Sequence, residues 1–517
     1  MIPDWMKGSS NPFSTVLIAN RGEIAVRIIQ AVKEAGLKSI AIYSDSDNNS
    51  LHVEMADYSI HLPGEKLLDT YLNIDAIISA AKSSGAEAIH PGYGFLSERA
   101  DFARSVSDAD LVWIGPSPES IEIMGDKISA RKKMIEFDVP IIPGEELIMD
   151  NEDFIEPLAS AAARVGYPLL LKASAGGGGK GMRSVYEPKN LKSQYEAASR
   201  EASAAFGNGT IYVERLLNKS RHIEIQILCD KYGNSIHLNE RDCSLQRRHQ
   251  KVIEEAPCPI LSKELRQLMG ESALKAAKSV DYVGAGTVEF LLSPNGDFFF
   301  LEMNTRLQVE HPITELITGI DIVQKQFEIA VGLELGLIQD DIGIIGHAIE
   351  ARIYAENPSN GFLPATGILS KWILPASPGV RLDSGFREGD KITIDFDPML
   401  AKLIVHSSSR NSAIRRLDSA LSEFIALGVV TNIGFLRNII NHPLFIRGEI
   451  TTDFLDNAPN ELFLEKEFDP AQLIAIASGA QKLGINKSHR HKNTDDLLND
   501  YNGHESDPFR TLSRNFP

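Results

Sequence analysis

The chain has 517 residues and a mass of 56.8 kDa, which at ~150 residues per domain corresponds to about three domains. Hydrophobic residues make up 43% and charged residues 24% of it, a globular composition that excludes disordered, collagen-like and disulfide-scaffold proteins. The formal net charge of -18 argues against nucleic acids and acidic membrane surfaces as partners.

Three cysteines, Cys229, Cys243 and Cys258, are odd in number and too far apart for a CxxC zinc or redox pair. We therefore interpret them as reduced, structural residues of a protein from a reducing compartment. The first residues show no secretory signal, and no apolar run approaches the ~18 residues of a membrane-spanning helix. These features predict a cytoplasmic protein with no membrane partner.

Short apolar runs alternate with helical patterns in the first part of the chain. Residues 15–19 form an apolar run that is followed by the turn 20–22 and a helical pattern, and similar runs occupy 39–43 and 88–90. This alternation predicts a doubly wound parallel sheet, whose ligands usually lie beyond the carboxyl ends of the strands. We assign residues 1–126 to an N-terminal α/β domain.

Short strands, glycine-rich turns and helices follow, and they predict a central α+β domain at residues 127–346. Within it, a glycine-centred stretch at about 144–215 is small enough to move as a lid. Frequent Gly and Pro with alternating residues then predict a third, strand-rich α+β domain at 347–456. The tail, 457–517, is predicted to hold one helix at 462–483 and otherwise to be disordered.

Residues 176–181 read Gly-Gly-Gly-Gly-Lys-Gly and allow three interpretations. A dinucleotide fingerprint would need an acidic residue at a strand end about 20 positions later, which this sequence lacks. A Walker loop fails because Gly181, rather than Ser or Thr, follows Lys180. A flexible hairpin that binds phosphate is favoured over a simple mobile turn, because Lys172 ends the preceding apolar run and needs an anionic partner.

Two acidic residues are predicted to face each other across a β-hairpin. Strands at 287–292 and 298–304 flank Asn295-Gly296, a strong two-residue turn signal. If Pro294 then faces Asp297, Glu289 lies opposite Glu302. Directly opposed carboxylates repel unless a cation lies between them, so the register predicts a Mg²⁺ or Mn²⁺ site. A solvated acidic face or a register slip remains the alternative.

The second of these strands continues into a polar face. Glu302, Asn304, Arg306, Gln308 and Glu310 have the same parity, so in an extended segment they point to one side. An arginine beside Glu310 can hold a small anion, and Glu310 can accept a proton from it. The pattern indicates a catalytic rather than a structural cluster.

These residues closely resemble the biotin carboxylase family of ATP-grasp enzymes. The resemblance implies that MgATP phosphorylates bicarbonate to carboxyphosphate, which carboxylates biotin carried on a protein lysine. It also makes the central domain an ATP-grasp domain with a mobile lid. The matching segments lie, in the family's order, at 18–25, 90–98, 124–127, 172 with the glycine loop, 240–251 and 302–311.

The resemblance also assigns site residues. Nucleotide contacts fall on Lys127, Lys172, Gly177, Gly178, Gly179, Glu214, Leu217, His222, Gln246, His249, Glu289 and Glu302. Two Mg²⁺ or Mn²⁺ ions fall on Glu289, Glu302 and Asn304, and bicarbonate on Lys251, Arg306, Gln308, Val309 and Glu310. The resemblance implies that Tyr93 and Arg352 bind biotin and that the catalytic residues are Glu310, Arg352, Lys251 and Arg306. Arg215 and Leu216 depart from the Lys and Tyr that some members have beside the adenine.

The chain contains no Met-Lys-Met biotin-attachment motif and no carboxyltransferase-sized region after residue 456. We therefore expect a separate biotin carboxyl carrier protein and an acyl-CoA carboxyltransferase subunit as partners, with acetyl- or propionyl-CoA as the final acceptor. The resemblance implies a homodimer or a larger complex. Two alternatives stay open: another bicarbonate-activating ATP-grasp ligase, such as a carbamoyl-phosphate synthetase fragment, and a silent nucleotide-binding scaffold.

Overall fold

The computed structural model describes residues 3–146, 155–173, 182–206, 209–248, 250–463 and 478–479. The described residues up to 463 belong to one compact unit. The predicted glycine loop, His249 and the tail beyond 463, apart from 478–479, lie outside the described residues. Among the helices that are described, none combines the length and the apolar character needed to cross a bilayer.

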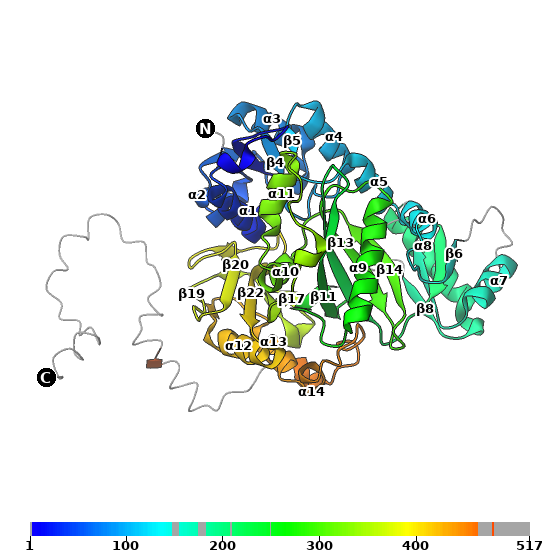
Figure 1. Cartoon of the computed structure of the whole chain (residues 1–517). Coiled ribbons are helices and arrows are strands. Elements are labelled where there is room, and N and C mark those ends of the chain that lie inside the picture. The colour runs from blue at the N-terminus through cyan, green and yellow to red at the C-terminus, as the bar shows by residue number, and fades with distance from the viewer. Residues whose placement is uncertain are drawn as a thin grey trace, which may run out of the picture. The chain divides into compact units, whose positions relative to one another are not determined.

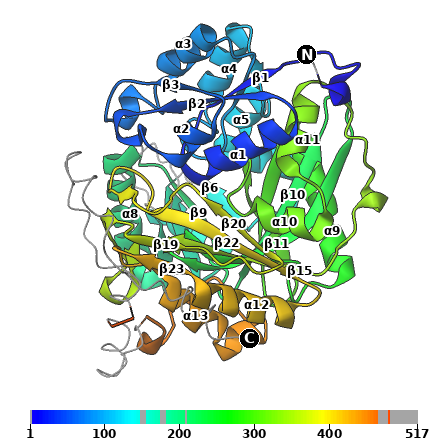
Figure 2. The same ribbon diagram turned by 90° about the vertical axis from the view of Figure 1, so that its left-hand side faces the viewer.

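The N-terminal part is a five-stranded parallel sheet with the strand order β3-β2-β1-β4-β5, of which Figure 2 labels β1, β2 and β3. Val16 and Ile18 of one face pack against α1 and α11, whereas Leu17 and Ala19 of the other face pack against α3 and α4. Helices therefore cover both faces, and the predicted doubly wound arrangement is confirmed. The strands are β1 (Thr15–Ile18), β2 (Lys38–Tyr43), β3 (Tyr58–His61), β4 (Ala88–His90) and β5 (Val112–Trp113). The helices are α1 (Gly22–Glu34), α2 (Leu51–Met55), α3 (Ile74–Ser84), α4 (Ala100–Asp108), α5 (Pro118–Gly125) and α6 (Lys127–Glu136).

A small antiparallel sheet occupies the stretch predicted as a lid (Figure 1). Its strand order is β6-β9-β7-β8, and it has a core of its own that includes Leu158, Leu169, Tyr195 and Val213. A separate core is what a lobe needs to move as a unit, and its mobility remains a prediction. The elements are β6 (Gly144–Glu146), α7 (Ile155–Val165), β7 (Leu169–Ala173), β8 (Arg183–Val185), α8 (Leu191–Phe206) and β9 (Ile211–Arg215).

The largest sheet has eight antiparallel strands in the order β14-β13-β10-β11-β12-β15-β22-β20. It runs through the boundary predicted at 346/347, because β15 pairs with β12. The third part of the chain therefore extends the central sheet. The strands are β10 (Arg221–Cys229), β11 (Ser235–Arg247), β12 (Gln250–Ala256), β13 (Gly284–Leu292), β14 (Phe298–Asn304), β15 (His347–Tyr354), β20 (Val380–Ser384) and β22 (Met399–Ser407).

Helices cover this sheet in patches. Ile223 and Val288 pack in a core with Met269 and Ala273 of α9, while Ile349 and Leu403 share another core with α12 and α13. The helices are α9 (Lys263–Lys278), α10 (His311–Thr318), α11 (Ile322–Ala330), α12 (Arg410–Glu423), α13 (Ile433–Ile440) and α14 (Pro443–Ile446). Short pairs complete the fold: β16 (Glu356–Asn357) with β17 (Leu363–Pro364), β18 (Gly367–Ile368) with β21 (Lys391–Ile392), and β19 (Lys371–Ile373) with β23 (Ile425–Leu427).

All three cysteines are free and buried, as their structural interpretation requires. Burial raises the pKa of the Cys229 thiol to about 12 and holds the pKa of Cys243 and Cys258 well above the ordinary value. Because the thiolate is the reactive form, a thiol-specific reagent at mildly alkaline pH should not label the folded protein. The three thiols should react once the chain is unfolded, and rapid labelling of the native protein would contradict this.

Candidate active site

A cavity of about 1340 Å³ opens between the parallel sheet, the small sheet and the large sheet. Tyr93 reaches it from the turn after β4, and Lys172 and Glu214 from strands β7 and β9. Most predicted site residues line it: Tyr93, Lys127, Lys172, Glu214, Leu217, His222, Gln246, Lys251, Glu289, Glu302, Asn304, Arg306, Gln308, Val309 and Arg352. The predicted Gly177, Gly178, Gly179 and His249 lie outside the described residues.

The hairpin places Glu289 opposite Glu302, as predicted. The predicted turn is wrong, because the backbone N–H of Ser293 donates to the carbonyl of Asp297, so Ser293 rather than Pro294 faces that residue. The loop is thus one residue longer. An irregularity beside Phe290 shifts the register by one residue and compensates. The acidic pair therefore arises from two cancelling departures from a regular hairpin.

The two carboxylates of this pair have different surroundings. Glu289 is buried and lies 3.0 Å from Lys251 Nζ and 2.9 Å from His222 Nε2. Burial alone would raise the pKa of Glu289, but these two cationic groups outweigh it and hold that pKa well below its usual range. Glu302 is exposed to the cavity and has no hydrogen bond or ion pair within the described part of the chain.

This donor set fits a hard divalent cation. Two carboxylates that face each other across a strand pair offer the oxygen ligands that Mg²⁺ and Mn²⁺ prefer, and Glu302 is still free to ligate. Asn304 fits less directly. Its amide nitrogen donates to Glu289 over 2.8 Å, and its amide oxygen accepts from Arg306 over 3.1 Å.

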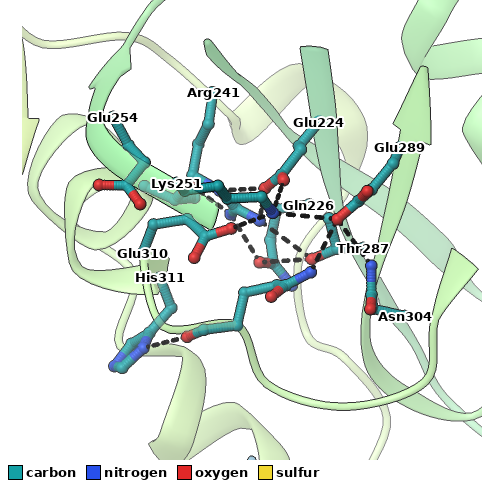
Figure 3. Close-up of polar contacts among 12 residues, drawn as sticks. Glu224, Gln226, Arg241, Lys251, Glu254, Thr287, Glu289, Asn304, Glu310 and His311 are labelled. Atoms are coloured by element: carbon teal, nitrogen blue, oxygen red, sulfur yellow. Dashed lines mark hydrogen bonds and ion pairs between the residues drawn. The ribbon is translucent and has the colours of Figure 1, made fainter. Parts of the chain in front are cut away.

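Lys251 lies at the centre of the polar cluster (Figure 3). Its ammonium contacts Glu224, Glu289 at 3.0 Å and Glu310 at 2.9 Å. Among the described residues, two triads are compact enough to hold a metal, His222 with Glu224 and Glu289, and Glu224 with Cys243 and Glu310. Because the Lys251 ammonium already contacts carboxylates of both triads, we assign no metal to either.

Glu310 is fully buried between two cations. Lys251 Nζ lies 2.9 Å from one of its oxygens, and Arg352 Nη2 lies 2.9 Å from the other. Burial acts to raise the pKa of Glu310, but Lys251, Arg352 and Arg241 overcome it and hold that pKa well below its usual range. Glu310 is therefore an ionised carboxylate at neutral pH, as a proton acceptor must be.

The segment between Asn304 and Glu310 differs from its prediction. Strand β14 ends at Asn304, so the extended conformation assumed for residues 305–310 is wrong. Arg306 forms no ion pair with Glu310 and instead donates to Glu98 at 2.9 Å and to Gln308 at 2.9 Å. The side chains still converge, because Gln308 donates to Glu289 over 3.2 Å.

The small sheet supplies the other cationic side of the cavity. The Lys172 ammonium contacts the Glu214 carboxylate across neighbouring strands, so its anionic partner here is a protein residue. Lys127 also lines the cavity, and burial together with Lys172 lowers its pKa. Because the positive charge of Lys172 disfavours the charged form of Lys127, an anion bound near both amines would stabilise the two ammonium groups.

A buried network behind Lys251 was not predicted. Arg241 is fully buried and donates to Gln226 at 2.8 Å, Thr287 at 3.0 Å and Glu224 at 3.1 Å (Figure 3). Residues Glu254 and Glu350 were missed as well. The sequence does carry a signal for part of it, because His222, Glu224 and Gln226 alternate with isoleucines along β10.

Family models of known proteins match three consecutive parts of the chain between residues 12 and 457. Three family models match: biotin carboxylase N-terminal domain at residues 12–121, carbamoyl-phosphate synthase L chain ATP binding domain at 126–338, and biotin carboxylase C-terminal domain at 350–457. The biotin carboxylase of Nostoc sp. is 48% identical over 443 residues, which cover 86% of this chain and 98% of that protein.

The mitochondrial methylcrotonoyl-CoA carboxylase subunit alpha of Dictyostelium discoideum is 50% identical over 445 residues. That match covers 86% of this chain and 63% of the subunit, so the chain spans less than two thirds of that relative. Among solved structures, the biotin carboxylase domain dimer of the Hydrogenobacter thermophilus 2-oxoglutarate carboxylase, in complex with MgADP, ADP and bicarbonate, has a TM-score of 0.83 at 45% identity. It covers 88% of this chain and 99% of the solved chain.

Proposed function

The chain belongs to the biotin carboxylase family, and from this premise we propose that it carboxylates protein-linked biotin with bicarbonate and ATP through carboxyphosphate. The observation that carries the proposal is the chain of contacts from Lys251 through Glu310 to Arg352, beside the opposed Glu289 and Glu302. It joins a cation and a base for bicarbonate, a guanidinium for biotin and a carboxylate pair for a metal.

In this proposal the nucleotide lies between the two sheets. We assign it to Lys127, Lys172, Glu214, Leu217, His222 and Gln246, together with His249, Gly177, Gly178 and Gly179 outside the described residues. Glu289, Glu302 and Asn304 would hold two Mg²⁺ or Mn²⁺ ions, which neutralise phosphate charge when bound. Lys172 and Lys127 add positive charge near the phosphates, since phosphoryl transfer depends mainly on positioned cations.

Bicarbonate is assigned to Lys251, Arg306, Gln308 and Val309, which line the cavity, and to Glu310, which is not part of the lining but contacts Lys251. Glu310 accepts its proton and Lys251 holds the resulting anion. To accept a proton, Glu310 must lose part of its ion pairing, because two close cations weaken its basicity. Arg352 then stabilises the negative charge on the ureido oxygen of biotin, which Tyr93 helps to hold.

The carrier and the final acceptor belong to the proposal too. Relatives include methylcrotonoyl-CoA and propionyl-CoA carboxylase alpha subunits, so we propose a biotin carrier domain or protein and an acyl-CoA carboxyltransferase as partners. A homodimer is proposed by analogy with the dimer named for the Hydrogenobacter domain. Three unpaired, buried cysteines support a reducing compartment, such as the cytoplasm.

We also retain the division into an N-terminal domain at 1–126, an ATP-grasp domain at 127–346 and a C-terminal domain at 347–456 as a proposal. The parallel sheet and the small sheet fall within the first two ranges. Because the eight-stranded sheet crosses residue 346, the second and third of these domains would not separate as independent folding units.

Release of ADP in the presence of bicarbonate, with and without free biotin, tests the function. Biotin should stimulate ADP release, and carboxybiotin should form from labelled bicarbonate only when ATP and Mg²⁺ are present. Turnover that needs bicarbonate but does not respond to biotin would favour a different bicarbonate-activating ligase. Nucleotide binding without turnover would favour a scaffold.

A further inference from the structure

Glu350 is a buried carboxylate that the proposed reaction does not use. It lies on β15, where it is directly opposite Glu254 of β12, and its exposed fraction is 0%. Opposed side chains in an antiparallel pair have Cβ atoms about 4.5–5.5 Å apart. Ile313 and Ile317 of α10 pack over this face of the sheet, with Ala348 and Ile404 on either side, so apolar side chains surround the two acids.

The hydrogen-bond groups of this pair are incomplete. Glu254 accepts from Arg352 Nε over 2.6 Å through one oxygen, but its other oxygen has no hydrogen-bond partner among the described residues. Neither oxygen of Glu350 has one in the same part of the chain. Two ionised carboxylates so placed would repel and remain undersolvated, whereas one shared proton would supply the missing donor.

The charged surroundings indicate which acid carries the proton. Burial raises the pKa of Glu254 as well, but Arg352 donates to Glu254 and counteracts that rise, so Glu254 is the more acidic member of the pair. Burial is the main cause that holds the pKa of Glu350 well above its usual range. The negative charges of Glu254 and Glu310 raise it further, and together these effects outweigh the positive charges of Lys402 and Arg352, which lower it. The charged or titratable groups around Glu350 are Glu254 of β12, Arg352 of β15, Lys402 of β22, Glu310 before α10 and His311 at its start, with Glu23 and Asp383 beyond Lys402.

We propose that Glu350 is a positioning residue: its protonated carboxyl group donates an O–H hydrogen bond to Glu254 Oε2 and so fixes the chain of contacts from Glu254 through Arg352 to Glu310. Arg352 has two anionic partners, Glu254 at 2.6 Å and Glu310 at 2.9 Å. If Glu310 accepts a proton during turnover, as the proposed function holds, Glu254 becomes the only charged partner of Arg352 in this chain of contacts. Glu350 then keeps the guanidinium aimed at biotin at that stage.

Two substitutions separate this role from a general packing role. Glu350→Gln keeps the volume and an N–H donor toward Glu254, whereas Glu350→Leu keeps an apolar volume and leaves the Glu254 oxygen unpaired. We expect Glu350→Gln to keep the ratio of biotin carboxylation to bicarbonate-dependent ATP hydrolysis within about threefold of the parent protein, and Glu350→Leu to lower it by at least about tenfold. An unchanged ratio in Glu350→Leu would overturn the proposal.

A matched control lies on the same strand as Glu254. Glu255 is buried and pairs with Arg410 and His347, away from the cavity. Glu255→Leu also removes a buried carboxylate, so it should lower the melting temperature without changing the ratio of the two activities. If its ratio fell as far as that of Glu350→Leu, the effect would be one of stability and the positioning role would be refuted.

A spectroscopic measurement does not depend on activity. The infrared spectrum of the full chain at neutral pH should contain a protonated-carboxyl C=O band that Glu350→Gln removes, and the absence of such a difference would refute the protonated state. This readout also decides the case if Glu350→Leu fails to fold. If the parent protein did not carboxylate biotin, the proposed function would fail while the infrared band still tested Glu350.

Discussion

Replacing Glu310 with glutamine should lower biotin carboxylation by about 10²- to 10⁴-fold, the usual contribution of a general base. Glutamine keeps the shape of the side chain and an acceptor oxygen but cannot take a proton from bicarbonate. Lys251 would retain Glu224 and Glu289, and Arg352 would retain Glu254, so the fold should survive with a loss of about 1.5–3 kcal/mol in stability. Carboxybiotin formation from labelled bicarbonate measures the rate.

The affinity for MgADP separates loss of the base from loss of the nucleotide site. It should change by less than about threefold in Glu310→Gln, because no assigned nucleotide contact is removed. Glu315→Gln is a matched control: Glu315 is buried on α10 and accepts from Arg27 and Arg381, whereas the cations paired with Glu310 are Lys251 and Arg352. That variant should lose stability and keep its rate. Near-normal carboxylation by Glu310→Gln would show that another group is the base.

The sequence was sufficient for the doubly wound N-terminal sheet, because its short apolar strands and helical patterns repeat within a local window. The Glu289–Glu302 pairing was also predicted correctly, but from an incorrect turn. Hairpin register is a local property, and the error of one residue at Ser293 was cancelled by a bulge that no turn signal reveals. The prediction was correct for a reason that the sequence did not contain.

The contacts of Glu310 could not be predicted in this way. Its partners Lys251 and Arg352 lie 59 and 42 residues away, and only strand pairing within the eight-stranded sheet brings them together. The alternation of side chains along an extended strand predicted Arg306 beside Glu310. The strand ends at Asn304, however, and Arg306 donates instead to Glu98 of the N-terminal domain. Glu350 was missed for the same reason.

The structure shows only one of the two hairpin carboxylates stabilised by protein groups, and this asymmetry predicts opposite effects on stability. Glu302→Gln should leave the melting temperature in EDTA unchanged or raised, since removing one of two opposed like charges relieves about 0.2–1 kcal/mol of repulsion. Glu289→Gln should lower it, because Lys251 and His222 lose an ionised partner.

Both variants should nevertheless lose activity, because both carboxylates are assigned to the metal. Charge stabilisation by a bound cation amounts to several kcal/mol, so we expect at least about a 100-fold loss of turnover in Glu302→Gln. The rise in melting temperature on adding MgADP should shrink in the same variant, since less binding energy is available to the folded state. A Glu302→Gln protein that is less stable in EDTA yet turns over normally would mean that Glu302 has a structural role and that the cation is held elsewhere.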